Sequence, residues 1–93
     1  MEIRLRPAVR LHWRRWDDEF VVYDEASGLT HRLDALIGSV LLRIEEGLVD
    51  ECRLTDAVAS DLGCPRDAIG RALPEALGQL AGADLIDTRA SCG

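Results

Sequence analysis

Hydrophobic and polar residues follow two different patterns along the chain, and the pattern changes after the first third. Three short runs come first, with period-two alternation or β-branched and aromatic residues, as expected of strands; they are Arg10–Trp16, Glu19–Tyr23 and Leu29–Leu33. Three longer segments follow with the apolar spacing of helices; they are Asp34–Glu46, Leu54–Leu62 and Pro65–Ala81. This order predicts an α+β fold in which an N-terminal three-stranded antiparallel sheet is followed by three helices.

Turn and cap residues support these boundaries. The pair Asp17-Asp18 predicts a turn between the first two strands, and Gly28 suits a left-handed position before the third. Asp34 stands where the N-cap of the first helix belongs. Pro74 lies inside the third helical segment, but the apolar stripe continues past it in phase, so we expect one kinked helix and not two.

The length of 93 residues predicts a single domain spanning 1–93. Leu85–Asp87 is expected to add a short strand or to pack on the core. The start, Met1–Arg4, shows no positive segment followed by an apolar one, so we expect no signal peptide and a cytoplasmic location. No apolar run approaches the ~20 residues of a membrane span, so no membrane partner is expected.

The formal net charge of −6 is carried by the helical part of the chain. Residues 1–33 hold six arginines and six acids, whereas residues 34–93 hold five arginines and eleven acids. Nucleic-acid binders need clustered positive charge, so a nucleic-acid partner is not expected. A local positive patch is nevertheless predicted on the sheet, from Arg10, Arg14 and Arg15.

The reactive residues form no catalytic or metal-binding pattern. There is no Ser/His/Asp order, phosphate-binding glycine loop or pair of buried carboxylates, so we predict neither an enzyme nor a cofactor. Cys52, Cys64 and Cys92 are odd in number and match no C-x-x-C spacing, which indicates free thiols. His12 is expected in solvent and His31 partly buried on an apolar face, so neither predicts a metal site.

Three segments carry a resemblance to a known family: Trp13–Tyr23, Ala26–Gly28 and Thr30–Asp34. Together they resemble PqqD-like peptide chaperones, nearest to the subgroup attached to HPr-related systems, over nearly the whole chain. The resemblance implies a winged-helix-like domain called the RiPP recognition element. Such a domain binds the leader segment of a ribosomally made precursor peptide and presents its core to a modifying enzyme. The leader adds to the third strand, beside the third helix.

The physical chemistry of a sheet edge agrees with that implication, because an edge strand offers unpaired amides and carbonyls to an extended peptide. The predicted peptide-binding edge consists of Leu29, Thr30, His31, Arg32 and Leu33. Thr30 and Arg32 point away from the leucine-bearing face, so we expect them to contact polar groups of the peptide.

A side-chain-poor ridge on the third helix is the second predicted part of the site. Gly70, Pro74 and Gly78 are four residues apart and therefore share one face. We hypothesise that this ridge forms a wall of the peptide cleft, with Arg71 and Glu75 on its rim. The alternative is that these small residues only allow close packing against the first helix.

Two other functions compete with peptide binding. A DNA-binding winged-helix regulator would read DNA with the third helix, whose first half offers only Arg66 and Arg71, opposed by Asp67 and Glu75. A small adaptor of an HPr-type phosphotransfer-related system needs an exposed histidine at a helix N-terminus, and neither histidine is placed there. An open strand edge also permits a homodimer.

Overall fold

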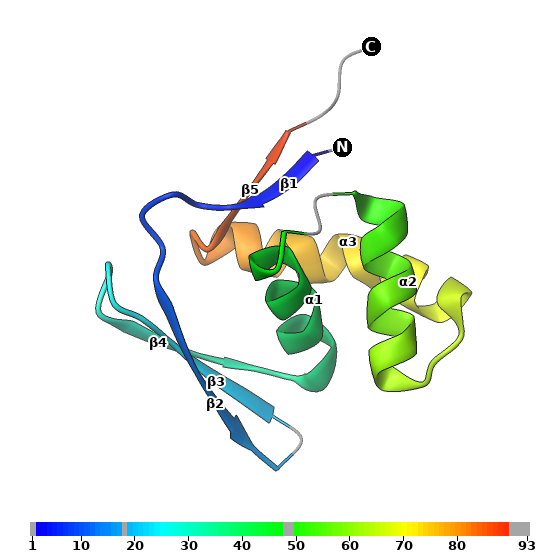
Figure 1. Ribbon diagram of the computed structural model, residues 1–93, viewed down its shortest axis with the longest axis horizontal. Helices are drawn as coiled ribbons and strands as arrows, with labels where there is room; N and C mark the ends of the chain where they lie inside the picture. The colour runs from blue at the N-terminus through cyan, green and yellow to red at the C-terminus, as the bar shows by residue number, and fades with distance from the viewer. Residues whose placement is uncertain (1, 18, 48–49, 90–93) are drawn as a thin grey trace.

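The structure, a computed structural model, describes residues 2–17, 19–47 and 50–89. Its elements in chain order are β1 (Glu2–Leu5), β2 (Leu11–Trp16), β3 (Glu19–Asp24), β4 (Leu29–Leu33), α1 (Ala35–Glu45), α2 (Glu51–Leu62), α3 (Arg66–Gly82) and β5 (Ile86–Arg89). The predicted α+β fold, with a three-stranded antiparallel sheet followed by three helices, is confirmed. Figure 1 shows this sheet on one side of α1 and a separate β1–β5 ribbon on the other.

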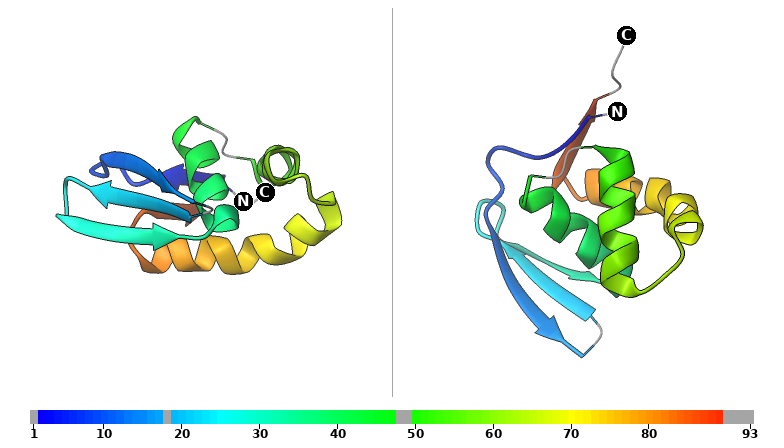
Figure 2. Two further views of the ribbon diagram at one scale, coloured as in Figure 1. Left: turned by 90° about the horizontal axis from the view of Figure 1, so that it is seen from below. Right: turned by 45° about the vertical axis from the view of Figure 1, so that its right-hand side comes forward.

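The three-stranded sheet has the order β2-β3-β4, and both pairings are antiparallel. Trp13, Val22 and His31 stand opposite one another in register, so their side chains share one face. Val22 is fully buried on that face, which we call the inner face because it packs on α1. The other face of the sheet, the outer face, has no helix over it (Figure 2).

A second, two-stranded sheet joins the two ends of the described chain. β1 pairs antiparallel with β5, in a register that runs from Glu2 opposite Arg89 to Leu5 opposite Ile86. Of the two expectations for Leu85–Asp87, the strand is the one that forms. β1 was not predicted, because a run of four residues is too short to indicate a strand until its distant partner β5 is known.

Helix boundaries follow the capping residues. The Asp34 carboxylate accepts a 2.8 Å hydrogen bond from an amide in the first turn of α1, as predicted. α2 begins at Glu51 and not at Leu54, because Asp50 caps it by accepting from the second helical amide at 2.9 Å. α3 is one helix that runs through Pro74, also as predicted.

The core is built by all three helices and both sheets. Its fully buried large side chains are Ile3, Val22, Val40, Leu41, Leu54, Val58, Leu73, Leu80, Leu85 and Ile86. Within the described residues, no helix combines the length and the hydropathy needed to cross a bilayer, and no three potential ligands gather as a metal site. Cys52 and Cys64 are free and exposed, while Cys92 lies outside the described residues.

A glycine allows the sheet to approach α1 closely. An ideal Cβ on Gly38 would lie 2.1 Å from the Phe20 ring, so that ring occupies the space of a side chain. Trp13 meets the Phe20 ring edge-on, with 5.7 Å between the centroids, and its indole donates a 3.1 Å hydrogen bond to Glu45. These contacts hold β2 and β3 on α1 and thereby position β4.

Candidate functional site

The strand predicted as the binding edge is an edge strand. β4 pairs with β3 along one side, and within the described residues no strand pairs with its other side. β5, the last described element, pairs with β1 and leaves this edge open.

The hairpin before β4 determines which way the backbone groups point. The Asp24 carbonyl accepts a 2.8 Å hydrogen bond from the Gly28 amide, on the β4 side of β3. The Glu25 amide donates a 2.9 Å hydrogen bond to the Arg10 carbonyl, on the β2 side. Successive residues of an antiparallel strand direct their backbone groups to opposite sides. Asp24 therefore faces β4, and its register partner Leu29 faces β3.

This alternation assigns the free groups of β4. Leu29, His31 and Leu33 direct their amides and carbonyls toward β3. Thr30 and Arg32 direct theirs toward the open edge, where two amides and two carbonyls lie ready for a further strand. The side chains of both residues are exposed on the outer face, as the sequence predicted.

In the view of Figure 2 (left), α3 follows the direction of β4 on the open-edge side, and a hollow lies at each end of β4. The hollow at the end of β4 has a volume of about 120 Å³ and is lined by Asp34, Leu36, Ile37, Ala72, Glu75, Ala76 and Gln79. The hollow at the start of β4 has a volume of about 290 Å³ and includes Val9, Leu29, Ala83 and Asp84. We call these two hollows, together with the β4 edge that joins them, the β4–α3 groove.

The groove is walled by alanines of α3. Ala72 and Ala76 lie on one face of the helix, because they are four residues apart, and Ala83 follows directly after the end of the helix. Gln79 shares that face, and Glu75 lies at its border. A wall with so little side-chain bulk leaves room for another backbone beside β4.

The predicted glycine and proline ridge lies elsewhere on α3. Gly70, Pro74 and Gly78 are exposed, and at 3.6 residues per turn Pro74 stands about 200° around the helix from Ala76. None of the three lines either hollow of the groove. An ideal Cβ on Gly78 would have no atom within 4 Å, so that residue does not serve close packing against α1 either.

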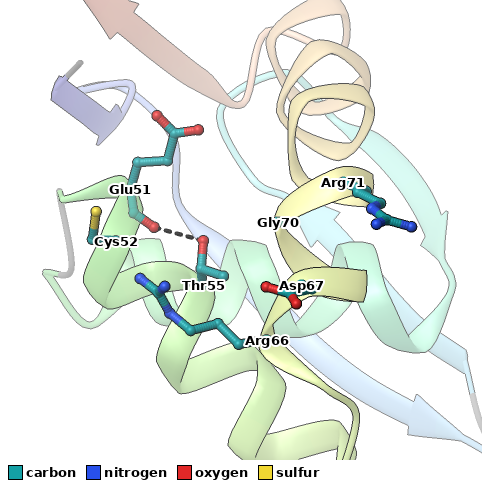
Figure 3. A pocket seen from close by; sticks show the side chains of 7 residues that line it. All are labelled: Glu51, Cys52, Thr55, Arg66, Asp67, Gly70 and Arg71. Carbon is teal, nitrogen blue, oxygen red and sulfur yellow. Dashed lines mark hydrogen bonds between the residues drawn. The ribbon is translucent and has the colours of Figure 1, made fainter.

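Gly70 and Arg71 instead line a pocket between α2 and α3, shown in Figure 3. An ideal Cβ on Gly70 would lie 4.0 Å from Thr55 of α2. Arg66, at the same pocket, binds Asp56, and this hydrogen bond raises the pKa of the guanidinium. Of the helix residues predicted for the site, Glu75 is thus the one that lines the groove beside β4.

Sequence spacing identified a face of small residues on α3, but it did not show which face of the helix points toward β4. The core stripe of α3 includes Ile69, Leu73 and Leu77, and each flank of that stripe carries small residues. The missed residues Ala72 and Ala76 resemble ordinary helix formers, so their only signal is their position next to the stripe.

The two histidines lie as predicted. His31 is on the inner face and partly buried. His12 is exposed on the outer face, where its Nε2 lies 3.1 Å from a carboxylate oxygen of Glu25.

A buried carboxylate shapes the hairpin that leads into β4. Asp24 is only 4% exposed, and its carboxylate accepts hydrogen bonds from the amides of Arg10 at 3.2 Å and Ala26 at 3.1 Å. Burial by itself raises the pKa of Asp24, but hydrogen bonds from the Ser27 side chain and from these two amides bring the pKa below its usual value. The charged form therefore stabilises the turn before β4.

Removal of this carboxylate has an expected cost that depends on pH. Asp24→Ala should lower the free energy of unfolding by about 1–3 kcal/mol at pH 7, because two backbone amides lose their charged acceptor. The folded-state pKa is depressed, so the contribution is present above the unfolded value and disappears as pH falls through the folded pKa. Urea unfolding from pH 7 to pH 2.5 measures this. A constant gap between wild type and Asp24→Ala over that range contradicts the assignment.

Comparison with solved structures shows two similar chains. TbiB1 in complex with the TbiA(beta) leader peptide matches with a TM-score of 0.70 at 26% sequence identity, over 95% of this chain and 99% of that chain. A lasso peptide synthetase B1 complexed with the leader peptide matches with a TM-score of 0.66 at 19% sequence identity, over 95% of this chain and 100% of that chain. The chain has the fold of these two leader-peptide-bound proteins. No protein-family model and no curated protein matches it.

Proposed function

We propose that this chain is a RiPP recognition element of the PqqD-like type, which captures the leader of a ribosomally synthesised precursor peptide by β-strand addition. One observation carries the proposal: the open edge of β4 faces the alanine wall of α3 in a fold shared with two leader-bound proteins. The subgroup attached to HPr-related systems belongs to the same proposal and is supported by the sequence motif alone.

The bound leader lies in the β4–α3 groove as a fourth strand. Its backbone pairs with the amides and carbonyls of Thr30 and Arg32. Alternate side chains of a strand point to opposite faces, so one set enters the groove and the other joins the outer face. Val9, Leu29 and Ala83 provide an apolar environment at the start of β4.

In this proposal the domain contributes no reaction of its own. It acts in the cytoplasm, holds the leader, and delivers the attached core peptide to a separate modifying enzyme. An edge-to-edge homodimer would use the same open edge as the leader peptide. The leader and a second copy of this chain therefore compete for β4.

Titration of the isotope-labelled domain with the TbiA(beta) leader peptide, and with a leader encoded beside the gene of this chain, tests the proposal. The amides of Thr30 and Arg32 should shift and become protected from exchange, because they gain hydrogen-bond partners. The amide of Gly78 should stay unchanged. Saturable binding that leaves the β4 amides unmoved contradicts strand addition.

Two leucine substitutions on α3 separate the groove wall from the predicted ridge. Ala72→Leu should weaken leader binding several-fold, because the larger side chain fills the hollow at the end of β4. Gly78→Leu should leave the dissociation constant within twofold, because that position lies in open space. Isothermal titration calorimetry on both variants checks this. Equal losses of leader affinity, or a loss for Gly78→Leu alone, would show that the ridge of Gly70, Pro74 and Gly78 forms the wall of the cleft.

A further inference from the structure

The outer face of the sheet is a second surface that leader binding leaves free. It contains a hollow of about 540 Å³ lined by His12, Trp13, Arg14, Val21, Tyr23 and Thr30. All three helices lie on the other side of the sheet (Figure 2). Antiparallel strands lie about 4.8 Å apart, so Arg14 on β2 stands two strands away from the peptide-binding edge.

Exposed apolar area in the described chain concentrates at two places. Tyr23, at 41% exposure, and Leu29, at 56%, are its exposed large hydrophobic residues. Leu29 lines the β4–α3 groove, where the proposed leader covers it. Tyr23 lies on the outer face beside Val21 and in ring contact with His12, with centroids 6.1 Å apart. The outer face thus has an apolar centre with no occupant in the proposed leader complex.

The charges around this centre favour an acidic partner. Both glutamates of the face are already engaged, Glu19 by Arg32 at 2.8 Å and Glu25 by His12 at 3.1 Å. The Arg14 side chain, in contrast, makes no ion pair and no side-chain hydrogen bond with the residues that the structure describes. In a chain of net charge −6 this is a local cationic surface.

We propose that the outer face docks an acidic surface of the peptide-modifying enzyme, with Tyr23 at its centre and Arg14 as its charged contact. The inference rests on the proposed function, because a leader strand added to β4 extends this same face and places alternate leader side chains beside Thr30 and Arg32. Tyrosine and arginine are enriched at interface centres, where they contribute most of the affinity. The enzyme therefore binds a composite surface of domain and leader.

The test uses the purified modifying enzyme encoded beside the gene of this chain, with the domain saturated by the neighbouring precursor's leader. Arg14→Glu should raise the enzyme dissociation constant about tenfold, because it places a negative charge against an acidic surface. Arg53→Glu, the same charge change on the exposed side of α2, should stay within twofold of wild type. Both variants should bind the leader as wild type does.

Several outcomes overturn the proposal. It fails if wild type does not bind the enzyme, or if Arg14→Glu binds the enzyme like wild type. It also fails if Arg53→Glu loses as much enzyme affinity as Arg14→Glu does. The proposal is likewise contradicted if Arg14→Glu weakens leader binding as much as it weakens enzyme binding, or if the outer face binds a DNA duplex through Arg14 in place of the enzyme. Leader affinity is measured separately in each variant, so failure of the leader site and failure of the docking face are distinguishable.

Discussion

Thr30→Pro should abolish leader binding while the fold remains intact. The Thr30 amide points to the open edge, so proline removes a donor that β3 does not use. Proline is tolerated on an edge strand where the amide faces solvent, and Leu29 before it is already extended. The ring also keeps an incoming backbone away from its neighbours. We expect the dissociation constant to rise at least about 30-fold, or about 2 kcal/mol.

Two matched variants isolate the backbone effect in this experiment. Thr30→Ala removes the side chain but keeps the amide, so it should bind the leader within about twofold. His31→Pro removes an amide that faces β3, so it should destabilise the sheet itself. Calorimetric titration and thermal unfolding measure the two quantities. Wild-type affinity in Thr30→Pro, with the fold preserved, rules out strand addition at β4.

Gly38→Ala should be the most destabilising single-methyl change in the sheet–helix contact. The new Cβ would lie 2.1 Å from the Phe20 ring, and that ring is confined by Trp13. Alanine gains about 1 kcal/mol in helix propensity, but overpacking at this point outweighs it. We expect a net loss of about 2 kcal/mol in the free energy of unfolding, or about 8–16 °C in Tm.

Gly78→Ala provides the matched control. It adds the same methyl group to a helix interior, at a place with no atom within 4 Å of an ideal Cβ. It should therefore increase the free energy of unfolding by about 0.5–1 kcal/mol. Urea unfolding followed by tryptophan fluorescence measures both variants. A Gly38→Ala protein as stable as Gly78→Ala would show that the Phe20 ring moves aside without cost.

The Gly38 contact links fold stability to the binding site. Phe20 of β3 stands opposite Leu33 of β4, so displacement of the ring moves the strand that carries the edge. Gly38→Ala should for that reason weaken leader binding as well as stability, whereas Gly78→Ala should change stability alone.

Local patterns determined most of the architecture. Alternation placed β4 at Leu29–Leu33, and the N-cap at Asp34 placed the start of α1. These features need only neighbours in sequence, because strand and helix periodicity, turn glycines and capping carboxylates act within a few residues. The resemblance carried by the same residues led to the leader-binding hypothesis.

Tertiary structure alone decided the pairing of β1 with β5 and the direction in which each face of α3 points. A helix with small residues on both flanks of its core stripe can direct either flank toward the sheet. Its rotation is set by how Leu73 and Leu77 pack in the core, which depends on residues distant in sequence. For that reason the sequence identified the β4 edge, whereas the alanine wall opposite it became visible only in three dimensions.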